Sequence, residues 1–168
     1  GFFDVEEHIL GGETMSLNHL EHGIIRVEYD EPRIHMALVC AAISCPAIRP
    51  EAYVGAHLDR QLEDQAVQFA NNPNHVSVEN NGDVVELSAI LKWYGQDWGS
   101  QDGYLEFLEE RAKDEDVRQA LAAARAGDVE VAFKNYDWTL NTTGDTTQTA
   151  SGGGGGGGEF GSGSIPNE

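Results

Sequence analysis

The stretch HVSVENNGDVVEL, residues 75–87, contains two runs of β-branched and apolar side chains on either side of an Asn-Asn-Gly-Asp turn sequence. Asn and Gly tolerate the positive φ angles that tight hairpin turns require. The stretch therefore predicts an antiparallel hairpin with strands over 75–78 and 84–87. Ser88 comes next and is a good N-cap for a short apolar helix.

Helical periodicity flanks this hairpin on both sides. Apolar residues recur at helical spacing over 55–70 before it, and over 101–112 and 115–126 after it. Gly127 follows the last of these segments and is a typical helix C-cap. The hairpin is thus expected to pack between helices.

A third strand is predicted near the end of the periodic sequence. Residues 129–133 alternate as a half-buried strand does, and 136–141 extend it. The pattern predicts an α+β fold, a small and mostly antiparallel sheet with packed helices, in a single globular domain over residues 1–141. We assign the clustered aromatic residues to its core rather than to a groove: Trp93, Tyr94, Trp98 and Tyr104.

The N-terminal part predicts a short extended segment over residues 2–5 and a turn at Gly11-Gly12. A helix follows over 17–27, with Ser16 or Asn18 as its N-cap.

The run IHMALVCAAIS, residues 34–44, is nearly all apolar and lies between Pro32 and Pro46. Its length and composition fit a strand buried on both faces, although periodicity does not distinguish such a strand from a buried helix.

Ten basic against 29 acidic residues give the chain a net charge of -19. Such a field repels phosphates and anionic lipids, so neither nucleic acid nor a membrane is expected as a partner. The acidity serves solubility, for example in a high-salt environment, or forms a cation-binding surface. The sequence lacks phosphate-loop and dinucleotide motifs, and no cofactor is expected. Two cysteines and no recognisable signal peptide leave both exported and cytoplasmic locations open.

Residues 142–168 have a different composition and include the glycine run 152–158. Polyglycine buries no apolar surface to offset its ordering entropy, so we interpret this segment as a disordered linker and tail left from cloning. The alternative is that the final residues 165–168 are a tethered ligand at raised effective concentration. Deleting 152–168 and measuring Tm separates the two, since only a bound tail stabilises the domain.

Four segments resemble one family in their order and residues: SLNHLEHGIIR (16–26), PRIHMALVCAAISCPAIR (32–49), KWYG (92–95) and YDWTLN (136–141). They are similar to the domain of unknown function 547 family, found in bacteria, plants and animals, and the resemblance covers roughly residues 1–141. Relatives usually carry an Asn-rich helix upstream of the first segment, which this chain lacks. The resemblance leaves open whether self-association or a partner chain replaces that helix. Relatives can have serine where this chain has Cys45.

Cys40 is the first candidate for chemistry, because a thiolate is a strong nucleophile when a neighbouring group lowers its pKa. His22 is the candidate base and matches the family's Glu-His pair. His35 is five residues from Cys40, which places the two on opposite faces of a regular strand. Asp137 or Asn141 is the candidate orienting group. The alternative is that Cys40 is an inert small hydrophobe.

The candidate substrate-binding residues are three arginines and the second cysteine: Arg26, Arg33, Arg49 and Cys45. The arginines can bind an anionic group or can pair with local acids. Cys45 can act as a redox partner of Cys40 if a turn brings their Cα atoms within about 7 Å. Two cysteines supply half of a zinc site, so no metal site is predicted.

Two functions remain open from the sequence. The first is an interaction module that binds a peptide or small molecule in a cleft between the His22 helix and the Cys40 segment. The second is a thiol-dependent hydrolase or transferase that acts on peptide or amide bonds with Cys40 and His22. Rapid alkylation of Cys40 in the folded protein favours the second.

Overall fold

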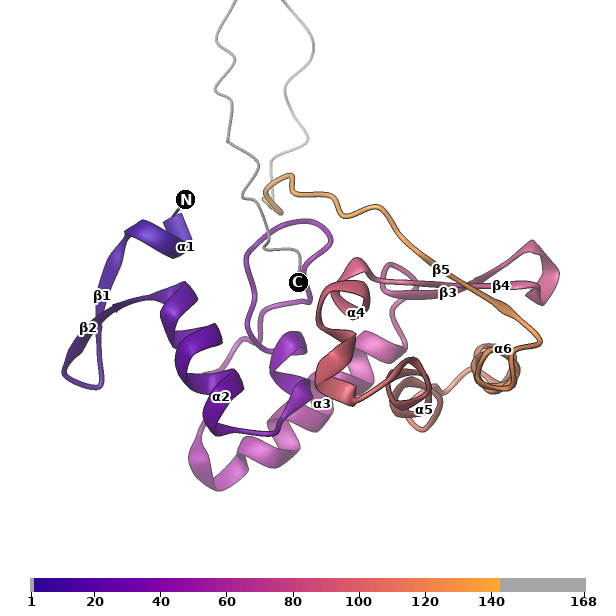
Figure 1. Ribbon diagram of the computed structural model, residues 1–168, viewed down its shortest axis with the longest axis horizontal. Helices are drawn as coiled ribbons and strands as arrows, with labels where there is room; N and C mark the ends of the chain where they lie inside the picture. Colours follow the sequence, from indigo (N-terminus) through magenta and orange to yellow (C-terminus); the bar gives the residue numbers. More distant parts are fainter. Residues whose placement is uncertain (1, 143–168) are drawn as a thin grey trace, which may run out of the picture. The chain divides into compact units, whose positions relative to one another are not determined.

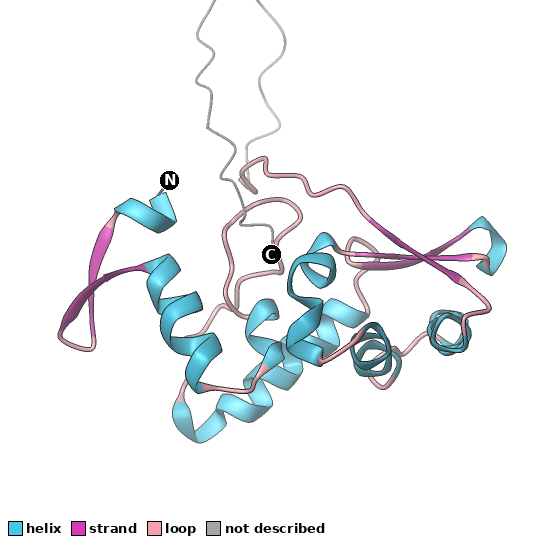
Figure 2. Ribbon diagram, in the orientation of Figure 1, coloured by secondary structure: helices cyan, strands magenta, loops and turns pink. Residues whose placement is uncertain are grey.

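A computed structural model describes residues 2–142 of this chain, and the tail predicted over 142–168 lies outside them apart from Thr142. The described residues form two compact units, residues 2–30 and Glu31–Thr142, which are treated separately. The α+β class is confirmed, with two small and mostly antiparallel sheets and several helices (Figure 2). No helix within residues 2–142 combines the length and apolar character needed to cross a bilayer.

The first unit is a short helix, a hairpin and a longer helical segment. Helix α1 (Phe2–Val5) stands where an extended segment was predicted, so that prediction is wrong. Strands β1 (Glu7–Leu10) and β2 (Glu13–Ser16) pair around the predicted Gly11-Gly12 turn, where both φ angles are positive.

The predicted helix over 17–27 is confirmed as η1 (His19–Ile25), a π-helical stretch that continues into α2 (Arg26–Glu28). Of the two proposed caps, Ser16 is the one that bonds, because its Oγ accepts the His19 N–H at 3.1 Å. Asn18 precedes the helix but its side chain makes no capping bond.

The second unit opens with the 3₁₀ helix η2 (Pro32–Met36), where a buried strand over 34–44 was predicted, and that prediction is wrong. Pro32 is well suited to the first helical position, and the Glu31 carboxylate caps the turn by accepting the Arg33 N–H. Beyond η2 the chain is irregular. Leu38 and Ile43 are 38% and 47% exposed, which a strand buried on both faces would not allow.

The central hairpin formed as predicted. Strands β3 (Val76–Glu79) and β4 (Val84–Leu87) pair antiparallel, and Asn80 and Asn81 adopt positive φ angles in the turn η4 (Asn80–Gly82). Helix α3 (Leu58–Ala70), preceded by the short turn η3 (Gly55–His57), confirms the helix predicted over 55–70.

The remaining elements complete the layer of helices and the sheet (Figure 1). Their bounds are α4 (Ala89–Tyr94), η5 (Gly95–Trp98), α5 (Gln101–Glu109), α6 (Glu115–Ala126) and β5 (Glu130–Phe133). Strand β5 adds to β4 in parallel, giving the order β3-β4-β5. The predicted extension over 136–141 is wrong, because β5 ends at Phe133 and only an isolated bridge joins Leu140 to Ala42.

The core of the second unit lies between this sheet and the helices, and α6 packs on β3 and β4. Tyr104 is buried, while Trp93, Tyr94 and Trp98 pack partly buried against the core, so their assignment to the core is confirmed. The largest side chains that are fully buried come from six elements: Phe69, Met36, Leu87, Leu91, Leu105, Leu108, Leu121 and Val85.

Candidate active site

The segment from Cys40 to Cys45 forms a tight loop that is held by a distant part of the chain. Ala41 has a φ of 60°, an unusual angle for a residue with a side chain, and the Cys45 N–H donates to the Ala42 carbonyl. Residues 137–141 lie alongside and bond to this loop through the backbone, with the Asn141 N–H donating to the Ala41 carbonyl at 2.7 Å. The loop thus supplies the turn that a Cys40–Cys45 contact requires.

The two thiols meet across this loop. The sulfurs of Cys40 and Cys45 are 3.0 Å apart, and the Cys40 N–H donates to the Cys45 sulfur at 2.9 Å. Both cysteines are free thiols, with Cys40 half-buried and Cys45 buried. The hydroxyl of Tyr136 lies 3.4 Å from the Cys40 sulfur.

The environment favours a thiolate at Cys40. Either sulfur can donate in their contact, but a charge costs more at the more deeply buried Cys45, so we place the proton there and the charge on Cys40. The bond from Cys45, with a further one from Tyr136, lowers the pKa of Cys40 to about 5. The same bond and burial raise the pKa of Cys45, and burial raises that of Tyr136.

Asp137 connects the cysteine loop to the segment after β5. Its N–H donates to the Ser44 hydroxyl at 2.9 Å, and its carboxylate accepts the Thr139 N–H at 2.9 Å. The bond from Thr139 lowers the pKa of Asp137. These contacts fit a turn-capping residue, the structural alternative to an orienting group in catalysis.

Three aromatic rings, those of Tyr136, Trp93 and Trp138, pack together next to the loop. Tyr136 packs against Trp93 and Trp138 with ring centroids 4.9 and 4.5 Å away, and the two indoles stack at 5.7 Å. Trp138 is 63% exposed. The cluster fixes the Tyr136 ring and offers an apolar surface beside the thiols.

His35 is held away from solvent by a separate group of residues. Its Nε2 lies 2.7 Å from an Asp97 carboxylate oxygen, and its ring stacks on Tyr94 with centroids 4.2 Å apart. Because residues 34–44 do not form a strand, the predicted opposite-face relation between His35 and Cys40 has no basis. The contact with Asp97 fastens η2 to η5.

The two candidate arginines of the second unit, Arg33 and Arg49, are engaged by local acids. Arg33 bonds to the Glu31 and Asp59 carboxylates at 2.6 and 2.8 Å, and the bond to Glu31 raises its pKa. Arg49 pairs with Glu51 and, at 3.7 Å, with Asp64. These contacts correspond to the alternative in which the cations neutralise neighbouring carboxylates.

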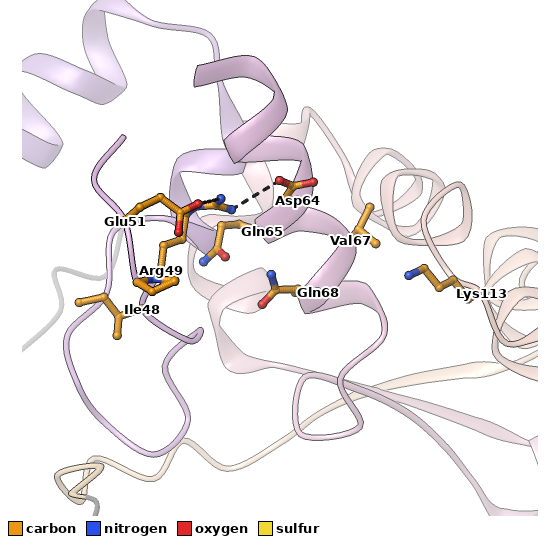
Figure 3. Close-up of a pocket in the computed structure, with 9 residues that line it drawn as sticks. Ile48, Arg49, Glu51, Asp64, Gln65, Val67, Gln68 and Lys113 are labelled. Carbon is orange, nitrogen blue, oxygen red and sulfur yellow. Dashed lines mark hydrogen bonds and ion pairs between the residues drawn. The ribbon is translucent and has the colours of Figure 1, made fainter. Parts of the chain in front are cut away.

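A pocket of about 440 Å³ lies beside Arg49 (Figure 3). Its lining comes from the loop after Cys45, from α3 and from Lys113: Ile48, Arg49, Pro50, Glu51, Asp64, Gln65, Val67, Gln68 and Lys113. Neither cysteine lines it. The Gln65 side chain, which lines the pocket, is held in position by hydrogen bonds that it donates to the carbonyls of Ala47 and Met36.

His22 and Arg26 belong to the first unit. They face each other across one helical turn, as predicted, with Arg26 Nη1 3.1 Å from His22 Nδ1, and Glu21 lies 3.9 Å from the other ring nitrogen. Since His22 and Cys40 are in different units, their pairing stays a prediction. Within residues 2–142, no group of three His, Cys, Asp or Glu side chains is arranged to hold a metal ion.

The family model described as protein of unknown function, DUF547, matches residues 1–70. Residues 1–70, less than half of the chain, are similar to this family. The DUF547 segment contains both cysteines and every candidate base and arginine, but it ends before Tyr136 and Asp137. Comparison with curated proteins and with solved structures found no match.

The sequence did not reveal two residues that contact the candidate Cys40 and His35 side chains. Tyr136 contacts Cys40 across 96 positions and Asp97 contacts His35 across 62. The signal for Tyr136 was its place in the YDWTLN segment, which the family resemblance had singled out. Asp97 lies outside every such segment and carried no signal.

Proposed function

We propose that this chain is a thiol-dependent hydrolase or transferase that acts on peptide or amide bonds, with Cys40 as its nucleophile. The observation that carries the proposal is the contact of the Cys40 sulfur with two groups able to donate a hydrogen bond to a thiolate, the Cys45 thiol and the Tyr136 hydroxyl, at 3.0 and 3.4 Å. Donors on a sulfur stabilise the thiolate, which is the reactive form.

The protonation state supports this role near neutral pH. With a pKa of about 5, Cys40 carries its charge at pH 7 without a base to remove the proton. Cys40 is half-buried rather than buried, and we propose that a reactant reaches its sulfur. Cys40 is therefore primed before any substrate binds.

Attack of the thiolate on a carbonyl carbon forms a carbon–sulfur bond and a tetrahedral oxyanion. When the oxyanion collapses, the carbon–nitrogen bond breaks and the leaving amine takes up a proton. Water or a second amine then releases the acyl group and restores the thiolate. His22 stays our proposed acid and base for these transfers, and Asp137 the proposed orienting group.

The test is the rate of Cys40 alkylation by iodoacetamide in the folded protein at different pH values. We expect stoichiometric labelling of Cys40 whose rate stays constant from about pH 9 down to 6, because a thiol with a pKa of about 5 is ionised throughout. Tyr136→Phe removes one donor and should move the midpoint of the profile upward. Cys40→Ser is the matched control, since it leaves only the buried Cys45.

A different result would end the nucleophile proposal. If Cys40 reacts only after unfolding, or with the midpoint of an ordinary thiol, it is a structural residue. The second candidate, an interaction module for a peptide or small molecule, is favoured by the pocket beside Arg49. Binding that survives Cys40→Ser but is lost on Gln65→Leu would support that module.

A further inference from the structure

We propose that Cys40 and Cys45 are a peroxide-sensitive pair, in which Cys40 is oxidised first and Cys45 then closes a disulfide. The inference goes beyond acyl transfer, because it requires both sulfurs and no substrate. It begins from their separation of 3.0 Å. A disulfide bond is about 2.05 Å long, so closure requires a movement of only about 1 Å.

The loop is already folded for this reaction. The positive φ of Ala41 and the bond from the Cys45 N–H to the Ala42 carbonyl bend the chain back on itself. The bridge between Ala42 and Leu140, with the bonds from residues 137–141, holds that bend. Folding of the domain therefore already brings the two thiols together, so disulfide formation carries little further cost in chain entropy.

Burial separates the roles of the two sulfurs. Cys40 is half-buried and its sulfur lies 3.4 Å from the Tyr136 hydroxyl, which can donate to a thiolate, whereas Cys45 is only 9% exposed. A dissolved peroxide reaches Cys40 more readily and reacts with a thiolate rather than a thiol. Cys45 is sheltered from the oxidant yet in contact with the sulfur that the oxidant modifies.

The oxidant is a hydroperoxide, ROOH. The Cys40 thiolate attacks the terminal oxygen, the O–O bond breaks, and ROH leaves after taking up a proton, which produces a sulfenic acid at Cys40. The Cys45 sulfur then attacks the Cys40 sulfur. An S–S bond forms, the S–O bond breaks, and the hydroxide leaves as water with the proton of Cys45. Two thiols have then given two electrons to one peroxide.

The disulfide would remove the nucleophile that we propose for catalysis and protect it from further oxidation. A sulfenic acid without a nearby thiol proceeds to sulfinic and sulfonic acids, which are not readily reversed. A disulfide returns to two thiols by exchange with a small dithiol. The pair thus acts as a reversible peroxide-responsive switch on Cys40.

The test is hydrogen peroxide treatment of the full chain at low concentration, followed by mass spectrometry of the intact protein and of its peptides. We expect loss of two hydrogens, a peptide crosslink between Cys40 and Cys45, and recovery of both thiols with dithiothreitol. Cys45→Ser should trap the sulfenic acid, detected as a dimedone adduct at Cys40. Cys40→Ser should slow thiol loss by about tenfold or more.

Circular dichroism of each variant shows whether it folds. Oxidation of the folded wild-type chain provides a test that needs no substitution. Addition of oxygen atoms without a crosslink, or disulfides only between chains, would overturn the inference. If Cys40 alkylates rapidly but forms no disulfide, the switch fails while the proposed nucleophile stands. If the disulfide forms but amides are never cleaved, the proposed enzyme fails and the switch stands.

Discussion

The ring of His75 is buried against Phe69, with centroids 4.4 Å apart and nearly parallel planes. Its Nδ1 makes no hydrogen bond within the described residues. Burial, together with the charge of Lys134, lowers the pKa of His75 from 6.5 to about 4. The folded protein therefore holds a neutral imidazole at pH values where the unfolded chain has already bound a proton.

This shift makes stability depend on pH. The neutral ring is compatible with the fold above pH 6.5, and stability is lost as the pH falls from 6.5 through about 4. Each pH unit in this window costs up to about 1.4 kcal/mol. We expect His75→Phe, which keeps the stacking on Phe69, to remove this part of the acid sensitivity.

Urea unfolding of both proteins at pH 7 and pH 5 measures the effect. Between pH 7 and pH 5, the free energy of unfolding of wild type should fall by about 2 kcal/mol more than that of the variant. Comparing the proteins at each pH cancels the carboxylate contributions that they share. An equal pH dependence in the two proteins would show that His75 is protonated in the fold.

Cys40 was predicted as the reactive residue because its type and the family resemblance singled it out. The sequence did not predict which groups would surround its sulfur. Cys45 is five residues away and needed an unusual φ angle at Ala41 to meet it, while Tyr136 comes from beyond β5. Contacts of this kind depend on the folded path of the chain rather than on local pattern.

At the scale of elements, α6 shows how local signals determine a helix. The Asp114 carboxylate accepts the N–H groups of Asp116 and Val117, and Gly127 ends the helix in the left-handed conformation. We expect Asp114→Ala to lower the free energy of unfolding by about 1 kcal/mol, because these donors lose their acceptor.

Asp114→Asn is the matched variant, since its side-chain oxygen can accept the same bonds and should cost only a few tenths of a kcal/mol. Thermal or urea unfolding of the three proteins measures the difference. An alanine variant as stable as the asparagine variant would mean that water replaces the cap at no cost.

The elements that the sequence predicted well share this local character. The hairpin over 75–87, α3 and α6 carry their turn or cap residues within a few positions. The run over 34–44 has such a signal only at its start, where Glu31 and Pro32 begin η2, and its hydrophobicity suggested a strand. Its conformation is fixed instead by the His35 contact with Asp97 and by bonds to residues 137–141, which a local pattern does not reveal.

At the scale of the whole molecule, two of the few cations each have several acidic neighbours. Arg125 contacts the carboxylates of Asp102, Glu106 and Glu109 at 2.8 to 2.9 Å, and Arg33 likewise has three acidic neighbours. Ion pairs at the surface contribute about 0–1 kcal/mol each. They offset only part of the repulsion among 29 acidic side chains.

Salt has two opposing effects on the stability of this protein. It weakens the exposed ion pairs but also screens the self-repulsion of a chain with a net charge of -19, and the second effect should dominate. We expect Tm at pH 7 to rise as NaCl increases from about 0.02 to 0.5 M, where the Debye length falls several-fold. Calorimetry at both salt concentrations measures the shift.

The same titration near pH 4.4, the isoelectric point, is the control. There the net repulsion vanishes and salt should leave Tm unchanged or lower it, because only attractive pairs remain to be screened. A Tm that rises equally at both pH values would point to an effect of salt on apolar burial rather than on charge. A Tm that falls with salt at pH 7 would mean that the arginine-centred clusters outweigh the repulsion.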